Sequence, residues 1–388
     1  MKKLQILVIL LLNISTFFAQ ESTLKERTQF LPDQPWQDNN GVHLNAHGAG
    51  VLFHNGIYYL YGEHKLAGET VGKMAVHCYS SVDLYNWKDK GAALLTSEDP
   101  SSEISEGCII ERPKVIYNKK SRKFVMWFHL ELKNQLRKSG RSGVAFSDQP
   151  TGPFTYLHSE RPDAGHWPIN VTEEQKASLP EAQKLIGTSF IGSPHPDRAK
   201  LPLMTRDFAG GQMAKDMTLF VDDDGKAYHI FSSEENATLH ISELSDDYLS
   251  HSGKWTRIFE YLWHEAPAIC KHDGRYWMLS SNCTGWNPNE ARSAVANSIW
   301  GPWQNLGNPC VGATPPNHLG PQLTFGGQST FILQVQGQKD AFIAMFDVWR
   351  PENLIASGYV WLPMQFQKNR FTISWQDAWD LSVFKKRN

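Results

Sequence analysis

Short apolar runs separated by polar turns make up most of the chain, and a helical pattern is nearly absent. The clearest unit is residues 266–282, where an apolar run enters a tight turn at Asp273-Gly274 and a second run, residues 276–279, returns. An Asp-Gly pair between two β-prone runs predicts a β-hairpin, because both turn residues must accept a positive φ. This pattern of an apolar run, a polar turn and a second apolar run occurs five times along the chain, and a second hairpin follows each copy.

Five repeated units of two hairpins each predict an all-β fold, the five-bladed β-propeller. A β-sandwich would not repeat one phrase five times, and a parallel β-helix would repeat at a much shorter period. In a propeller the innermost strand of every blade begins beside the central axis. We therefore expect the first arm of each copy to be that strand, and the residues at its start to converge on one end of the axis.

Three segments depart from the repeat. Residues 1–20 combine two lysines, an apolar run and a small-residue end, which predicts a signal peptide and a secreted or periplasmic protein. A membrane anchor is the alternative, but the run is short for a bilayer span. Residues 21–35 are polar with two prolines and are interpreted as a leader or linker, which leaves one domain over residues 36–388. An insertion at about 158–210 contains a helical pattern over residues 172–185 and is a candidate wall for a pocket.

Composition and charge limit the kinds of molecule that the protein is expected to bind. A formal net charge of −2 offers no basic field for nucleic acid, no later stretch is apolar enough to cross a membrane, and a monomer is expected. The 14 tryptophans suit the C–H faces of sugar rings, although they also fill β cores. The five cysteines show no C-x-x-C spacing, which argues against zinc. Cys270 and Cys283 lie on two arms of one hairpin, so a disulfide is one interpretation and buried free thiols are the preferred one.

Polar side chains stand at or just before the first arm of each copy. They are His47, Glu111, Asp216, Glu265 and Gln328, in the order of the copies. Ionised groups are unfavourable in a β core unless they are paired, and clustered carboxylates raise one another's pKa. One of them then becomes a usable proton donor near neutral pH. Inverting glycoside cleavage uses two such groups, about 6.5–9.5 Å apart, with one protonating the leaving oxygen and the other activating water.

Each of these residues also has a structural interpretation, as a surface strand start, a turn cap, an ion-pair partner or an ordinary core histidine. The acidic run Asp222–Asp224 is interpreted as a solvated hairpin turn rather than a calcium loop. This chemistry requires no cofactor. A calcium ion on the axis is conceivable, but no motif specifies it.

The phrases at the blade starts resemble glycoside hydrolase family 43, the five-bladed propeller glycosidases. The resemblance covers residue 36 to the C-terminus and implies that Glu265 is the general acid, with Asp216 tuning its pKa and orienting it. The phrases that carry it are residues 58–61, 80–87, 111–117, 216–225, 265–268 and 281–286.

Blade one departs from the family pattern, because Gly48 stands where the family places an aspartate as general base. The same loss marks the branch that resembles exo-β-1,3-galactanases and β-galactosidases. That branch implies Glu111 in the site and Gln328 as the base, through its imidic acid tautomer. Since a neutral amide is a poor base, Glu111 acting directly on the water and Gln322 remain as alternatives.

The resemblance also implies that Thr284 and Trp286 line the sugar pocket, with Trp286 as a stacking platform. His47 is a further candidate for substrate binding. Trp127 and His129 lie on the second strand of blade two and are candidates for substrate contact, although packing between blades is an equal alternative.

These observations together predict a secreted, inverting exo-glycosidase that releases terminal β-linked galactose from plant-type glycans such as arabinogalactan or β-1,3-galactan. An α-L-arabinofuranosidase or β-xylosidase on the same fold is one alternative. A non-catalytic glycan-binding propeller is another, because the usual base is missing. A sialidase-like propeller would need three arginines, and Arg112 is the one arginine at a blade start.

Overall fold

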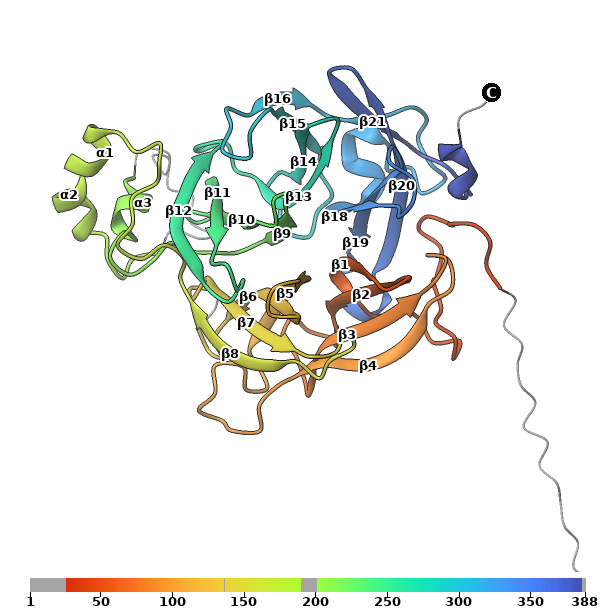
Figure 1. Ribbon diagram of the computed structural model, residues 1–388, viewed down its shortest axis with the longest axis horizontal. Helices are drawn as coiled ribbons and strands as arrows, with labels where there is room; N and C mark the ends of the chain where they lie inside the picture. Colours follow the sequence, from red (N-terminus) through yellow and green to blue (C-terminus); the bar gives the residue numbers. More distant parts are fainter. Residues whose placement is uncertain (1–25, 136, 190–200, 386–388) are drawn as a thin grey trace, which may run out of the picture.

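The computed structural model describes residues 26–135, 137–189 and 201–385. Five antiparallel sheets surround a central axis (Figure 1), which confirms the predicted five-bladed β-propeller. Blades one and two consist of β1 (His47–His54), β2 (Ile57–Glu63), β3 (Met74–Ser81), β4 (Lys88–Leu95), β5 (Ile109–Asn118), β6 (Lys123–Glu131), β7 (Arg141–Ser147) and β8 (Thr155–Glu160). Blades three and four consist of β9 (Met217–Val221), β10 (Ala227–Ser233), β11 (Thr238–Leu244), β12 (His251–Ile258), β13 (Glu265–His272), β14 (Arg275–Ser281), β15 (Arg292–Ala296) and β16 (Gln304–Gly307). Blade five consists of β18 (Gln328–Gln334), β19 (Phe342–Val348), β20 (Gly358–Gln367) and β21 (Arg370–Ser374), with β17 (Cys310–Val311) added in parallel to β21.

The first strand of each repeat is the innermost strand of its blade, as expected. β1, β5, β9 and β13 follow one another around the axis, and β18 lies between β13 and β1. The starts of β5, β9, β13 and β18 line one pocket, to which blade one adds Glu63 from β2, and later residues of all five inner strands surround a second cavity farther along the axis. The repeat therefore brings one short segment from every blade to the same end of the axis.

A β-bulge follows the start of several inner strands. The register shifts directly after Glu111 in blade two and directly after Glu265 in blade four. The next residues, Arg112 and Ala266, have φ of 55° and 51°, and Gly48 has the equivalent place in blade one with φ of 57°. Because a bulge bends its strand and redirects the adjacent side chains, it turns the preceding carboxylates toward the axis rather than into the sheet.

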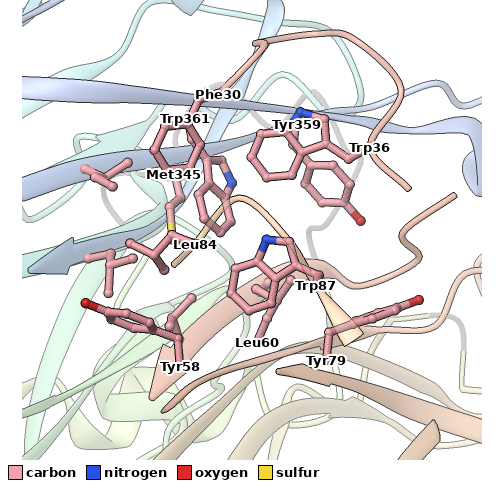
Figure 2. Close-up of a cluster of buried hydrophobic side chains, with 14 of the residues drawn as sticks. Phe30, Trp36, Tyr58, Leu60, Tyr79, Leu84, Trp87, Met345, Tyr359 and Trp361 are labelled. Carbon is pink, nitrogen blue, oxygen red and sulfur yellow. The ribbon is translucent and has the colours of Figure 1, made fainter. Parts of the chain in front are cut away.

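Residues 26–35, interpreted from sequence as a leader or linker, are instead packed into the propeller. Phe30 is 2% exposed, lies beside Trp361 (Figure 2) and stacks on Trp379 with a centroid distance of 4.3 Å. The backbone N–H of Asp33 donates to the carbonyl of Tyr359 at 2.8 Å. Burying one such aromatic ring contributes about 1.5–3 kcal/mol, so the domain begins before residue 36. Residues 1–20, predicted to be a signal peptide, lie outside the described residues.

The insertion carries three short helices, α1 (Glu173–Ala177), α2 (Leu179–Gln183) and α3 (Leu203–Arg206), which lie outside β12 (Figure 1). The single helix predicted over residues 172–185 is divided at Ser178. Pro180 explains the division, because it lacks an amide hydrogen and its ring clashes with the carbonyl four residues earlier. Among the described residues, no helix is long and apolar enough to span a bilayer.

All five cysteines are free thiols, and four of them are buried. The disulfide considered between Cys270 and Cys283 is therefore not formed. Cys270 is buried in the core cluster between blades four and five, whereas Cys283 lies in the loop after β14 with its Sγ 3.7 Å from the carbonyl oxygen of Asn236.

Candidate active site

The inner-strand starts surround a pocket of about 230 Å³. This volume lies below the roughly 300–1,000 Å³ of sites for drug-sized ligands, and it suits one sugar ring rather than a bound oligosaccharide. Carboxylates, cations and two tryptophans share its wall. The lining residues are Glu63, Glu69, Glu111, Arg112, His129, Arg137, Lys215, Asp216, Asn236, Glu265, Gly285, Trp286, Gln328 and Trp349.

Glu265 begins β13 and is the carboxyl best suited to hold a proton. Burial, and next the negative charge of Asp216, raise the pKa of Glu265 to about 8, although Arg112 and Lys215 act in the opposite direction. The side-chain amide of Asn236 donates to Glu265 Oε1 at 2.6 Å. A carboxyl group with this pKa is largely protonated at neutral pH, which is what a general acid requires.

Asp216 stands immediately before β9 and contacts the backbone beside Glu265. Its Oδ2 accepts the N–H of Ala266 at 3.1 Å and lies 3.0 Å from the guanidinium of Arg112. It therefore fixes the bulge that aims Glu265, while its charge raises the pKa of Glu265. This arrangement suits the pKa-tuning and orienting role that the family resemblance implies.

Glu111 is held as an anion. Burial alone would raise its pKa, but the charges of Arg137 and His129 hold the pKa well below its usual range. Arg137 contacts Glu111 Oε1 at 2.9 Å, and His129 Nδ1 lies 3.0 Å from Oε2. Burial would lower the pKa of His129, yet the carboxylates of Glu111 and Glu131 raise it to about 9. A carboxylate with two cationic partners is a weak base, which disfavours Glu111 as the direct activator of water.

Gln328 begins β18 with its amide orientation fixed. Its Oε1 accepts from Arg112 at 2.7 Å and from the indole N–H of Trp349 at 2.9 Å, and its Nε2 donates to Ser281 Oγ at 3.1 Å. Guanidinium and indole groups donate but do not accept, so the oxygen must face them. Both donors also stabilise negative charge on that oxygen, as develops when an amide nitrogen loses a proton. Gln322 is exposed in the 3₁₀ segment Pro321–Gly326 and does not line the pocket, so this alternative base is wrong.

A carboxylate from the neighbouring strand fills the place left open by Gly48. A Cβ on Gly48 would lie 2.1 Å from Glu63 Oε1, and Glu63 ends β2. Oε1 of Glu63 also accepts the N–H of Arg112 at 2.9 Å, and its Oε2 contacts the ammonium of Lys65. The backbone N–H of Gly48 donates to Asp347 at 2.9 Å. Blade one therefore supplies a carboxylate from its second strand instead of its first.

Trp286 and His129 line the pocket, as the sequence suggested. Trp286 meets Trp349 edge to face, with centroids 5.2 Å apart and an interplanar angle of 71°. Lys65 lies 6.0 Å from the ring centroid of Trp286. The exposed sides of the two indoles form an aromatic wall beside the carboxylates.

Three predicted substrate-binding residues lie elsewhere. Trp127 is fully buried between blades two and three, and its indole donates to the carbonyl of Tyr248 at 2.8 Å. It lies two residues deeper in β6 than His129, about 6.6 Å along the strand. His47 is fully buried and stacks on Tyr359 at 4.9 Å. Thr284 is exposed and donates to the carbonyl of Asn287, so it supports the loop that presents Trp286.

Several lining residues were missed by sequence reasoning because they lie in loops or at second-strand ends. Glu63 ends the second strand of blade one, directly opposite His47, and Asp347 lies opposite Gln328 in the same way in blade five. A polar residue near the end of a second strand could therefore have identified Glu63 from the sequence. Arg137, Asn236 and Trp349 lie in loops, where the hairpin repeat gives no position.

The described residues do not fit an axial calcium ion. Glu111, His129 and Asp216 place three ligand atoms within 4.8 Å of one another, but Arg137 and Arg112 already pair with the two carboxylates. Calcium prefers six to eight oxygen ligands. The amino group of Lys114 lies nearby instead and donates to the carbonyls of Gly48 at 2.7 Å and Arg112 at 3.3 Å, while burial lowers the pKa of Lys114 to about 7.

Lys114 lies between the pocket and a second cavity. Its side chain is 1% exposed, lines that cavity, and bonds the carbonyls of Gly48 and Arg112 at the bulges of blades one and two. Beyond it, the five inner strands enclose a cavity of about 340 Å³ lined largely by apolar side chains.

Proteins of known structure have a similar fold and a similar sequence. The family model for glycosyl hydrolases family 43 matches residues 165–344. A family 43 β-1,3-galactosidase, BT3683, solved with galactodeoxynojirimycin, is 48% identical, with a TM-score of 0.82 over 91% of this chain and 100% of that chain. An exo-β-1,3-galactanase from Clostridium thermocellum is 31% identical, with a TM-score of 0.70 over 90% of this chain and 66% of that one.

An exo-β-1,3-galactanase from Phanerochaete chrysosporium, solved with galactose, is 29% identical, with a TM-score of 0.70 over 90% of this chain and 67% of that one. No curated protein matches the chain. Because it covers the whole of a relative that is 48% identical, the chain belongs to glycoside hydrolase family 43 and is a glycoside hydrolase.

Proposed function

We propose that this protein is a secreted or periplasmic exo-hydrolase that removes terminal β-linked galactose from β-1,3-galactan or arabinogalactan side chains, with inversion at the anomeric carbon. The observation that carries the proposal is Glu265, a carboxyl group with a pKa of about 8 facing a pocket that suits one sugar ring. The solved relatives named above, a β-1,3-galactosidase and two exo-β-1,3-galactanases, support galactose as the sugar.

Glu265 donates its proton to the glycosidic oxygen as the bond to the leaving chain breaks. The carboxylate that forms is stabilised by the amide of Asn236 and by the positive charges of Arg112 and Lys215. Asp216 acts in the opposite direction, because its negative charge disfavours the carboxylate and keeps Glu265 protonated until the step begins.

Water attacks from the opposite face, with Gln328 as the base. Nε2 first gives a proton to Ser281 Oγ, which releases its own hydroxyl proton to solvent. This leaves an imidate whose oxygen is stabilised by Arg112 and Trp349. The imidate nitrogen then takes the proton of the attacking water and becomes the neutral amide again, while Glu265 regains its proton from solvent. Glu111 remains ionised throughout and anchors Arg137 at the rim.

The rim favours action at a chain end. Arg137 contacts Glu69 at 3.1 Å and Glu111 at 2.9 Å, which joins the loops of blades one and two across one side of the opening. Trp286 and Trp349 close the other side and offer an aromatic surface to the C–H face of a sugar. A terminal residue enters such a pocket, whereas an internal residue would need a groove open at both ends.

The test measures galactose released from β-1,3-galactan and from an aryl β-galactoside, beside Glu265→Gln. We expect that variant to lose nearly all activity on the polysaccharide, and proton NMR to detect α-galactose as the first product. Unchanged release from the polysaccharide by Glu265→Gln, or β-galactose as first product, would contradict the assignment. A panel of aryl arabinofuranosides and xylosides separates the other family 43 activities.

We further propose a monomer that needs no cofactor. Sedimentation velocity and activity after EDTA treatment test these two points, and the N-terminal mass of the exported protein tests the signal peptide.

A further inference from the structure

Three consecutive residues behind the proton donor adopt a left-handed backbone. Glu234, Glu235 and Asn236 have φ of 51°, 58° and 71° in the turn between β10 and β11. None is glycine, and such a conformation persists only where the surrounding structure imposes it. Strained segments of this kind occur preferentially at functional sites, and this turn ends at a residue that lines the pocket.

Two buried ion pairs hold the turn in place. Glu234 is fully buried, and Arg257 contacts both of its oxygens, at 2.6 Å and 2.8 Å, while His240 lies 2.9 Å from Oε1. Glu235 is 1% exposed and accepts from Arg206 at 2.7 Å. Separating a buried carboxylate from its cation would strongly destabilise the folded protein. Each ion pair therefore holds the backbone of the turn residue that carries the carboxylate.

The second pair connects the turn to the insertion. Arg206 is the last residue of α3, and Asp207 holds its guanidinium through two hydrogen bonds of 2.8 Å. The insertion was expected to be a candidate wall of the pocket, but none of its described residues lines the pocket. The insertion instead reaches the site indirectly. Arg206 pairs with Glu235, and the next residue, Asn236, donates to Glu265.

The turn delivers one hydrogen bond with a chemical consequence. Asn236 Nδ2 donates to Glu265 Oε1 at 2.6 Å, while Asn236 Oδ1 lies 3.4 Å from Ser232 Oγ. An amide N–H donates only, and the carbonyl oxygen of a neutral carboxyl group is a better acceptor than its hydroxyl oxygen. The hydrogen bond to Oε1 therefore favours the proton on Oε2.

We propose that Asn236 is a positioning residue that keeps the acidic proton on Oε2 of Glu265, and that the insertion, through Arg206, holds Asn236 for this task. The proposal rests on Glu265 being the general acid. The hydrogen bond also favours the ionised form of Glu265. Its loss raises the pKa of Glu265 and lets the proton occupy the wrong oxygen.

The experiment compares two β-galactosides, one with a good phenol leaving group and one with a poor alkyl leaving group. A poor leaving group needs the acid, and a good one does not. We expect Asn236→Ala to lower kcat on the alkyl galactoside by about 10- to 100-fold, part of the roughly 10²–10⁴ that a placed acid contributes. We expect a loss below about threefold on the phenyl substrate, and an alkaline limb of kcat/KM that moves to higher pH.

Arg206→Met should produce the same pattern to a smaller degree, and Glu235→Gln provides a second variant if Arg206→Met fails to fold. Lys123→Met is the control, because Lys123 pairs with Asp148 at 2.5 Å at the start of β6, the end of that strand opposite His129 and the pocket. It should change neither the leaving-group dependence nor the pH profile.

Equal losses on both substrates with an unmoved alkaline limb would mean a merely structural role and would overturn the proposal. Unchanged activity of Asn236→Ala would also overturn it. Glu265→Gln in the same series separates this failure from failure of the proposed function, since a Glu265→Gln that stays active on the alkyl galactoside refutes the general acid itself.

Discussion

Restoring a side chain at Gly48 should damage the protein rather than improve it. The family's aspartate base would occupy this position, so Gly48→Asp is the change that a comparison of sequences alone would suggest. The structure forbids it for two reasons. Gly48 has φ of 57°, and a Cβ there would lie 2.1 Å from Glu63 Oε1 and 3.1 Å from the backbone nitrogen of Arg112.

The two reasons can be given magnitudes. A left-handed backbone costs a residue with a side chain about 1–3 kcal/mol, and overpacking a filled site costs about 1–3 kcal/mol more. Gly48→Ala should therefore lower the free energy of unfolding by about 2–6 kcal/mol. Gly48→Asp should lower it further, because it adds a buried carboxylate beside Glu63 and Asp347. Against a typical stability of about 5–15 kcal/mol, either change is severe.

Equilibrium unfolding in urea measures these changes, with Gly56→Ala as the matched control. Gly56 has φ of 83°, and no atom lies within 4 Å of the place where its Cβ would be. The control therefore reports the backbone cost without the overlap. Equal losses for Gly48→Ala and Gly56→Ala would refute the claim that Glu63 fills the site. A stable Gly48→Asp with a raised kcat would refute it as well.

Three further predictions concern the pocket. The folded pKa of Glu265, about 8, lies above the ordinary 4.5, so stability should fall as pH rises through this window. Glu265→Gln should not lose stability with rising pH in this way. Thermal unfolding from pH 4 to 9 should therefore find this variant more stable than wild type at pH 9, although the variant is inactive. Trp286→Ala should raise KM about tenfold with little change in kcat, the equivalent of about 1.4 kcal/mol of binding. Steady-state kinetics would contradict this if kcat fell instead. Lys114→Met should lower the free energy of unfolding by about 1–3 kcal/mol, because it leaves two carbonyls unpaired, and it should lower activity. Lys271→Met is the control, because Lys271 lines the same second cavity, and it should leave activity unchanged.

The sequence predicted the parts of the site that follow from the repeat. Glu111, Asp216, Glu265 and Gln328 all stand at equivalent starts of inner strands, and the structure brings all four to one pocket. Hairpin signals fix these positions, because strand alternation and tight turns are local properties of the chain. The convergence then follows from propeller geometry without knowledge of any contact.

The remaining parts depend on contacts that no spacing rule describes. Trp127 and His129 share one face of β6, and depth along the strand alone separates a core residue from a lining one. Asn236 reaches Glu265 through a left-handed turn that is imposed by distant arginines. Phe30 looked like part of a polar leader, although its stacking partner Trp379 comes from the other end of the chain. Such features arise from tertiary packing.

The position of Lys114 has a consequence for how sugar moves through the enzyme. Its Nζ bonds the carbonyls of Gly48 and Arg112, which joins blades one and two between the pocket and the second cavity. We expect this link to block passage along the axis, so that released galactose leaves by the route along which the polymer entered and the shortened chain withdraws first. Each cleavage then ends in complete dissociation. The enzyme would trim many chains by one unit each rather than one chain to its end, and free galactose would compete directly with the next chain end.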